Sequence, residues 1–138
     1  MKLVDTEKFI PQKLDYNFKG KKILIVEDVE DNAELLNFYF SKTQAELFFA
    51  GNGKEAVEIC KSNHSIDIVL MDIQLPMMNG YEATSEIRKF MPDLPVIAIT
   101  AYAQLEDKKK CFEAGCNDYL SKPISKATLF MAVDRLIK

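Results

Sequence analysis

Short apolar runs alternate along the chain with stretches in which apolar residues recur every three or four positions. The runs are too short for helices, and several are rich in β-branched residues, so they predict strands at residues 23–26, 45–50, 68–71, 95–99 and 118–120. The periodic stretches predict amphipathic helices at about residues 30–42, 104–114 and 125–137, with two more around residues 56–60 and 81–90.

Alternating strands and helices joined by short loops predict an α/β fold, in which a parallel sheet carries helices on both faces. Every strand of such a sheet points its carboxyl end toward the same edge, where α/β proteins bind their ligands. Residues 1–20 show no sustained period and are expected to form an arm or linker, with residues 21–138 as one domain. We expect the apolar side chains of the arm to hold parts of it on the domain; these are Phe9, Ile10, Tyr16 and Phe18.

Four of the five predicted strands lead into a residue that can take part in chemistry. Glu27 and Asp28 follow the first strand, Asp72 ends the third, Thr100 ends the fourth and Lys122 follows the fifth. Three carboxylates close together repel one another unless a positive group lies among them. The candidates are the ammonium group of Lys122 and a hard divalent cation, and Mg²⁺ suits a site built from oxygen ligands.

This set of residues suggests phosphoryl transfer onto Asp72. A carboxylate can be the nucleophile that forms an aspartyl phosphate, and it needs no general base because its unperturbed pKa is ~4. Mg²⁺ would face one phosphoryl oxygen, Lys122 a second, and the hydroxyl of Thr100 would donate to a third. Taken singly, Asp72 is also typical of a helix cap, Thr100 of a turn and Lys122 of a loop; their combination favours a site.

The composition narrows the range of functions. A chain of 138 residues with 48% hydrophobic and 28% charged residues is typical of one globular domain. The net charge of -3 indicates no general affinity for nucleic acid. No apolar run suits a membrane span or a signal peptide, so we expect a cytoplasmic protein without membrane insertion. Three cysteines and one histidine favour neither a disulfide framework nor a zinc site.

Residues 51–54, Gly-Asn-Gly-Lys, superficially resemble a phosphate-binding loop. The full pattern requires a glycine where Phe48 stands and a hydroxyl residue where Glu55 stands. We therefore interpret residues 51–53 as a turn between the second strand and the helix that follows it.

Four segments together closely resemble the receiver domain of two-component response regulators. They are ILIVED at 23–28, MDIQLPMMNG at 71–80, ITA at 99–101 and KP at 122–123. The segments are in register, and the resemblance covers about residues 21–138. It implies a flavodoxin-like, doubly wound (βα)5 sandwich with strand order 2-1-3-4-5, which agrees with the apolar pattern. Residues 27–32 and 80–84 are most like receivers of hybrid histidine kinases, and residues 17–22 resemble the linker before such a receiver.

The resemblance implies a role for each acidic candidate. Asp72 matches the phospho-acceptor of the family, and Glu27 with Asp28 matches its acidic pair. By this likeness Asp28, Asp72 and the backbone carbonyl of Gln74 would ligate Mg²⁺, with Glu27 acting through water.

The other implied roles concern signalling. Thr100 and Lys122 match the family's hydroxyl residue and lysine, and Tyr119 matches the aromatic switch that turns inward when Thr100 moves. The implied phosphodonor is a histidine kinase or a histidine phosphotransfer protein, which would dock on the first helix near Leu35 and Phe38. Relatives also use a helix face for dimers, and no direct binding to nucleic acid is expected.

Three other functions agree with parts of this pattern. A phosphatase with an aspartyl nucleophile usually carries a second Asp two positions on, where this chain has Gln74. A flavodoxin-type carrier would need a phosphate loop rich in Ser, Thr and Gly, whereas the first loop here is acidic. A degenerate receiver that only docks would not need every charged position. We therefore expect a phospho-accepting signalling domain, not an enzyme, with only self-phosphorylation from phosphodonors and slow self-dephosphorylation.

Overall fold

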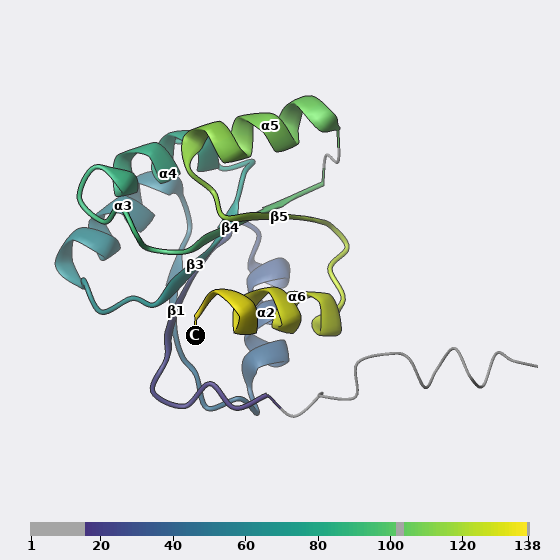
Figure 1. The fold of residues 1–138 in the computed structure, drawn as a ribbon. Helices are drawn as coiled ribbons and strands as arrows, with labels where there is room; N and C mark the ends of the chain where they lie inside the picture. The colour runs from purple at the N-terminus through teal and green to yellow at the C-terminus, as the bar shows by residue number, and fades with distance from the viewer. Residues whose placement is uncertain (1–15, 102–103, 138) are drawn as a thin grey trace, which may run out of the picture.

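The structure, a computed structural model, describes residues 16–101 and 104–137. Within these residues the strands are β1 (Lys22–Val26), β2 (Glu46–Ala50), β3 (Ile68–Asp72), β4 (Val96–Thr100) and β5 (Asp118–Ser121). The helices are α2 (Glu30–Phe40), α3 (Gly53–Ser62), α4 (Gly80–Arg88), α5 (Leu105–Ala114) and α6 (Lys126–Leu136). Strands and helices alternate as the apolar pattern predicted (Figure 1). Among the described helices, none has both the length and the apolar character that crossing a bilayer requires.

The strands form one sheet in the order β2-β1-β3-β4-β5, and every pairing is parallel. This confirms the predicted flavodoxin-like sandwich. In the ladders, Val26 lies beside Met71, and Asp72 lies beside Ile99. The carboxyl ends of β1, β3, β4 and β5 therefore meet at one edge of the sheet.

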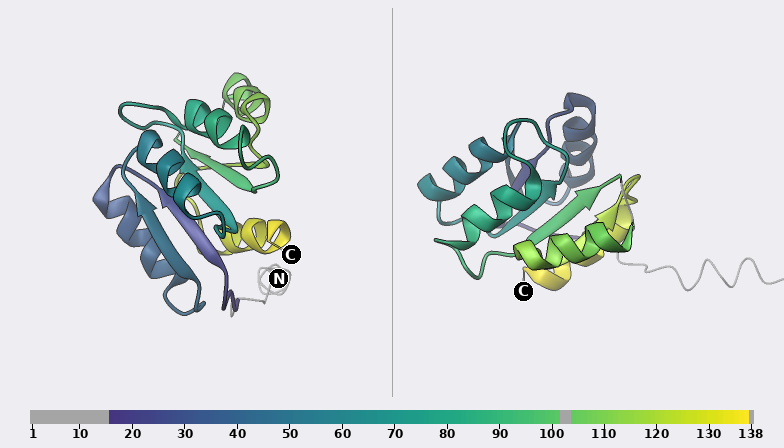
Figure 2. Two further views of the ribbon diagram at one scale, coloured as in Figure 1. Left: turned by 90° about the vertical axis from the view of Figure 1, so that its left-hand side faces the viewer. Right: turned by 90° about the horizontal axis from the view of Figure 1, so that it is seen from above.

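Helices cover both faces of the sheet (Figures 1 and 2). Within β1, Leu24 and Val26 belong to the core beneath α3, α4 and α5, whereas Ile23 and Ile25 belong to the core beneath α2 and α6. All residues of β3 and β4 are buried. Strands covered on both faces read as continuous apolar runs, which is why the sequence marks them so clearly.

The segment before β1 packs on the α2 and α6 side of the sheet. Tyr16 and Phe18 are 7% and 2% exposed, and their ring centroids lie 5.4 and 5.7 Å from that of Phe130. These two residues thus share the core of α6, as anchoring of the arm requires. Phe9 and Ile10 lie outside the described residues, and a domain that begins at residue 21 stays a prediction.

Local sequence fixes the start of α4 and the end of α5. The side chain of Asn79 accepts from the Glu82 N–H and the carboxylate of Glu82 accepts from the Asn79 N–H, so a capping box starts α4. A Cβ on Gly80 would lie 2.5 Å from the carbonyl oxygen of Asp72, so only glycine lets α4 begin this close to β3. As predicted, Gly115 ends α5, with a left-handed φ of 108°.

Candidate functional site

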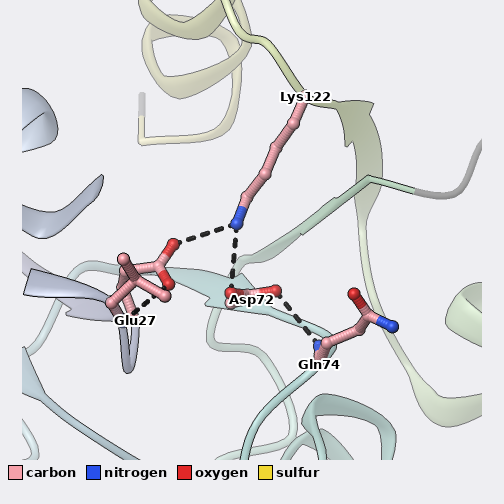
Figure 3. Close-up of polar contacts among 5 residues, drawn as sticks. Glu27, Asp72, Gln74 and Lys122 are labelled. Carbon is pink, nitrogen blue, oxygen red and sulfur yellow. Dashed lines mark hydrogen bonds and ion pairs between the residues drawn. The ribbon is translucent and has the colours of Figure 1, made fainter. Parts of the chain in front are cut away.

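Charged side chains from three strand ends meet at the carboxyl edge of the sheet. Glu27 follows β1, Asp72 is the last residue of β3, and Lys122 follows β5 (Figure 3). The Nζ atom of Lys122 lies 3.1 Å from Oε1 of Glu27 and 3.1 Å from Oδ2 of Asp72. The side chains of Glu27 and Asp72 are only 3% and 6% exposed, so Lys122 is the counter-ion that two buried carboxylates share.

The electrostatics of these groups are set by burial and by one another. Burial raises the pKa of Glu27, contact with Asp72 raises it further, and hydrogen bonds from the Val29 N–H and from Lys122 oppose the rise. Burial alone would lower the pKa of Lys122, but the two carboxylates together outweigh burial and raise it. Lys122 is therefore charged at neutral pH, yet one ammonium cannot neutralise two carboxylates.

Asp28 adds a third carboxylate to this cluster. One carboxylate oxygen from each of Glu27, Asp28 and Asp72 lies within 4.8 Å of the others. Asp28 is exposed while the other two are buried, so the cluster opens to solvent on one side. Oxygen donors with excess negative charge fit a hard divalent cation such as Mg²⁺, as expected from the sequence.

Backbone N–H groups hold two of the carboxylates in place. The N–H of Gln74 donates to Oδ1 of Asp72 at 3.1 Å (Figure 3), and the N–H of Val29 donates to Oε2 of Glu27 at 3.1 Å. Gln74 was singled out in the sequence for its carbonyl, so its N–H contact is an addition, and Val29 was missed. The available signal was spacing, because an acid often accepts from the N–H two residues further along in a turn.

Thr100 and Tyr119 lie on the adjacent strands β4 and β5. Thr100, the last residue of β4, is 1% exposed, and its carbonyl oxygen accepts from the Lys122 N–H at 2.7 Å. The residue before it, Ile99, pairs with Asp72 in the sheet. Tyr119 in β5 is half-buried and packs against the core beneath α3, α4 and α5. Thr100 thus ends the strand next to that of Asp72, whereas Tyr119 pairs with Ala98 one strand further on, and their switch role stays a prediction.

The outer face of α2 offers apolar surface beside this cluster. Leu35 and Phe38 are 48% and 70% exposed, so neither side chain is buried in the core. A cavity of about 400 Å³ extends from α2 to the segment after β5, lined by Glu27, Asn32, Leu35, Leu36, Tyr39, Ile99, Lys122, Pro123 and Ile124. Because Glu27 and Lys122 line it, this cavity connects the exposed helix face with the charged cluster.

The sequence matches the family model of the response regulator receiver domain over residues 23–134. It is 44% identical over 119 residues to hybrid signal transduction histidine kinase G of Dictyostelium discoideum, covering 83% of this chain and 3% of that protein. It is 38% identical over 120 residues to sensor histidine kinase RcsC of Escherichia coli K12, covering 84% of this chain and 12% of that protein. The chain therefore spans a small part of the length of these relatives.

Solved structures share the fold. The receiver domain of sensor histidine kinase PA1611 from Pseudomonas aeruginosa, with a magnesium ion coordinated in its active-site cleft, is 36% identical with a TM-score of 0.80, covering 86% of this chain and 98% of that one. A chain of the co-crystal of the Saccharomyces cerevisiae histidine phosphotransfer protein Ypd1 with the Ssk1 receiver domain is 32% identical with a TM-score of 0.81. That match covers 87% of this chain and 90% of that one.

Proposed function

Because this chain belongs to the response regulator receiver family of two-component signalling, we propose that it accepts a phosphoryl group from phosphohistidine on Asp72. One observation carries the proposal: at a single sheet edge, the ammonium of Lys122 lies 3.1 Å from Asp72, with the carboxylates of Glu27 and Asp28 beside it. An acceptor needs a held nucleophile and positive charge for the incoming phosphoryl oxygens. Both are present at this edge.

In the transfer, an ionised oxygen of Asp72 forms a bond to phosphorus while the bond from phosphorus to the donor's imidazole nitrogen breaks. The electron pair stays on that nitrogen, which takes a proton from solvent. The Gln74 N–H on Oδ1 and Lys122 on Oδ2 fix the orientation of the acceptor carboxylate. Positioning and charge neutralisation are the main contributions a protein makes to such a transfer.

The donor set fits Mg²⁺, which Asp28, Asp72 and the backbone carbonyl of Gln74 would hold, with Glu27 acting through water. When bound, the ion supplies positive charge opposite the phosphoryl oxygens. The excess negative charge of the three clustered carboxylates supports this assignment.

We assign the conformational response to Thr100 and Tyr119. A phosphoryl group brings about two negative charges and strong acceptors, so it draws the Thr100 hydroxyl and the Lys122 ammonium toward itself. The half-buried Tyr119 on the adjacent strand then turns inward to fill the space that Thr100 leaves. A switch of this kind carries the signal from Asp72 to the surface of the domain.

We assign the donor to a histidine kinase or a histidine phosphotransfer protein that docks on α2, in the cytoplasm. The exposed Leu35 and Phe38 and the cavity that leads toward Lys122 support this surface. A neighbour structure in which a receiver domain is co-crystallised with a histidine phosphotransfer protein supports the class of partner.

The test is intact mass after incubation with acetyl phosphate and Mg²⁺. The unmodified protein should gain one phosphoryl group, Asp72→Asn should gain none, and Asp93→Asn, which alters an exposed acid before β4, should behave like the unmodified protein. Rapid turnover of acetyl phosphate without an adduct would indicate a phosphatase instead. Neither adduct nor turnover would indicate a domain that only docks.

A further inference from the structure

The Gly-Asn-Gly turn at residues 51–53 touches the loop that follows Asp72. Gly53 is the buried first residue of α3, and a Cβ there would lie 2.2 Å from the carbonyl oxygen and 3.0 Å from the carbonyl carbon of Met78. Gly51 differs, because a Cβ there would have nothing within 4 Å. Of these two glycines, only Gly53 permits a close approach between backbones.

Met78 belongs to the loop of residues 73–79, which joins β3 to α4. At the base of this loop the Gly80 N–H donates to the carbonyl oxygen of Ile73 at 3.0 Å. On its far side the loop rests on Gly53 through the Met78 backbone, and the Met78 side chain packs against the core. Gln74 lies between these two fixed points, so its position depends on both.

We propose that Gly53 is a positioning residue for the Gln74 carbonyl and thereby sets the affinity of the site for Mg²⁺. The inference rests on the proposed function, because it takes that carbonyl as a metal ligand. A methyl group at position 53 would lie 2.2 Å from the Met78 carbonyl oxygen, so the Met78 backbone would have to move away by more than about 1 Å to reach ordinary contact distance. The Gln74 N–H also donates to Asp72 at 3.1 Å, so the displacement reaches the acceptor carboxylate as well.

The test compares the Mg²⁺ dissociation constants of Gly53→Ala and two control variants by isothermal titration calorimetry. Gly51→Ala makes the same chemical change without a clash. Asn52→Ala removes the side-chain cap that accepts from the Glu55 N–H, so it loosens the start of α3 without crowding Met78.

Supporting groups around a metal site typically change affinity by one to two orders of magnitude, so Gly53→Ala should bind Mg²⁺ about tenfold more weakly. Both control variants should bind like the unmodified protein. Equal affinities in all the variants would overturn the proposal. An equal loss in Asn52→Ala would also overturn it, because general loosening of α3 would then explain the effect.

A measurement on the unmodified protein covers the case in which Gly53→Ala does not fold. Mg²⁺ should shift the amide NMR signals of both Gly53 and Met78 and leave that of Ser62, at the far end of α3, in place. An unshifted Gly53 signal would overturn the inference while the acetyl phosphate adduct still supports the proposed function. Absence of Mg²⁺ binding and of the adduct in the unmodified protein would overturn both.

Discussion

The Nζ atom of Lys122 lies 3.1 Å from Oδ2 of Asp72, although the two residues are 50 positions apart in the sequence. The same atom lies 3.1 Å from Oε1 of Glu27. Parallel strands bring these side chains together because each delivers its carboxyl end to one edge of the sheet. Lys122 therefore offsets part of the carboxylate charge before any phosphoryl group arrives, and an incoming phosphoryl group would compete with two carboxylates for it.

Lys122→Met should lower the free energy of unfolding at pH 7 by about 2 kcal/mol, because it leaves two buried carboxylates without their counter-ion. Lys89→Met is the matched control, since Lys89, at the C-cap of α4, pairs with Glu86 at an exposed site. Loss of this exposed ion pair should lower the free energy of unfolding by less than about 0.5 kcal/mol. Urea unfolding measures both. Equal stability of Lys122→Met and the unmodified protein would contradict the role of Lys122 as counter-ion.

Mg²⁺ should stabilise the folded protein, because the carboxylate cluster exists only when the strand ends are assembled. At ten times its dissociation constant the ion should raise the free energy of unfolding by about 1.4 kcal/mol. Asp28→Asn should lose most of this gain, whereas Asp31→Asn, an exposed acid in the first turn of α2, should keep it. Thermal unfolding with Mg²⁺ and with chelator gives the comparison. Equal gains in the two variants would indicate a non-specific salt effect.

Phe38→Glu should slow phosphoryl transfer from a phosphorylated histidine phosphotransfer protein by more than about tenfold, because exposed aromatic anchors dominate binding energy. Labelling by acetyl phosphate should not change, since a small donor needs no docking surface. Phe112→Glu is the control: Phe112 lies on α5 and is 45% exposed, against 70% for Phe38. The measurement is the rate of phosphoryl transfer to each variant, followed by gel or by mass. Slower reaction with both donors would point to a damaged site instead.

β3 shows why so much of the fold and site was predictable. Four apolar residues followed by Asp72 predicted both the buried strand and the acid at its end, and the structure confirms both. A parallel sheet leaves one edge for strand ends, so Lys122 could be grouped with Asp72 once the strands were recognised. The role of Gly115 at the end of α5 was equally predictable, because a glycine after an amphipathic stretch is typical of a left-handed helix end.

Loop geometry was not predictable in the same way. The N–H groups of Gln74 and Val29 hold the carboxylates through backbone atoms, so side-chain identity carries little information about them. Gly51 and Gly53 look alike in the sequence, yet only Gly53 touches the loop after Asp72. Such contacts depend on how separate loops pack against one another, which a periodic pattern does not record.

The cysteines give a prediction that is independent of the site. Cys60, Cys111 and Cys116 are all buried free thiols. Burial raises the pKa of Cys60 to about 11, and burial with the neighbouring Cys116 raises that of Cys111 to about 12. Only the thiolate reacts, so native protein at pH 8 should react slowly with a disulfide reagent, and all the thiols should react at once in urea. Rapid reaction of the native protein would contradict this burial.

The raised pKa of Cys60 also makes stability depend on pH. The folded protein keeps this proton up to about pH 11, whereas the unfolded chain loses it near the ordinary value of 9.0. Between these values the unfolded state binds fewer protons, so the free energy of unfolding falls as pH rises, by roughly 1 kcal/mol per pH unit from this thiol. Cys60→Ala should therefore show a shallower decline between pH 9 and 11 than the unmodified protein in urea unfolding. Identical declines in the two proteins would contradict this prediction, because they would mean that Cys60 loses its proton at the same pH in the folded and unfolded states.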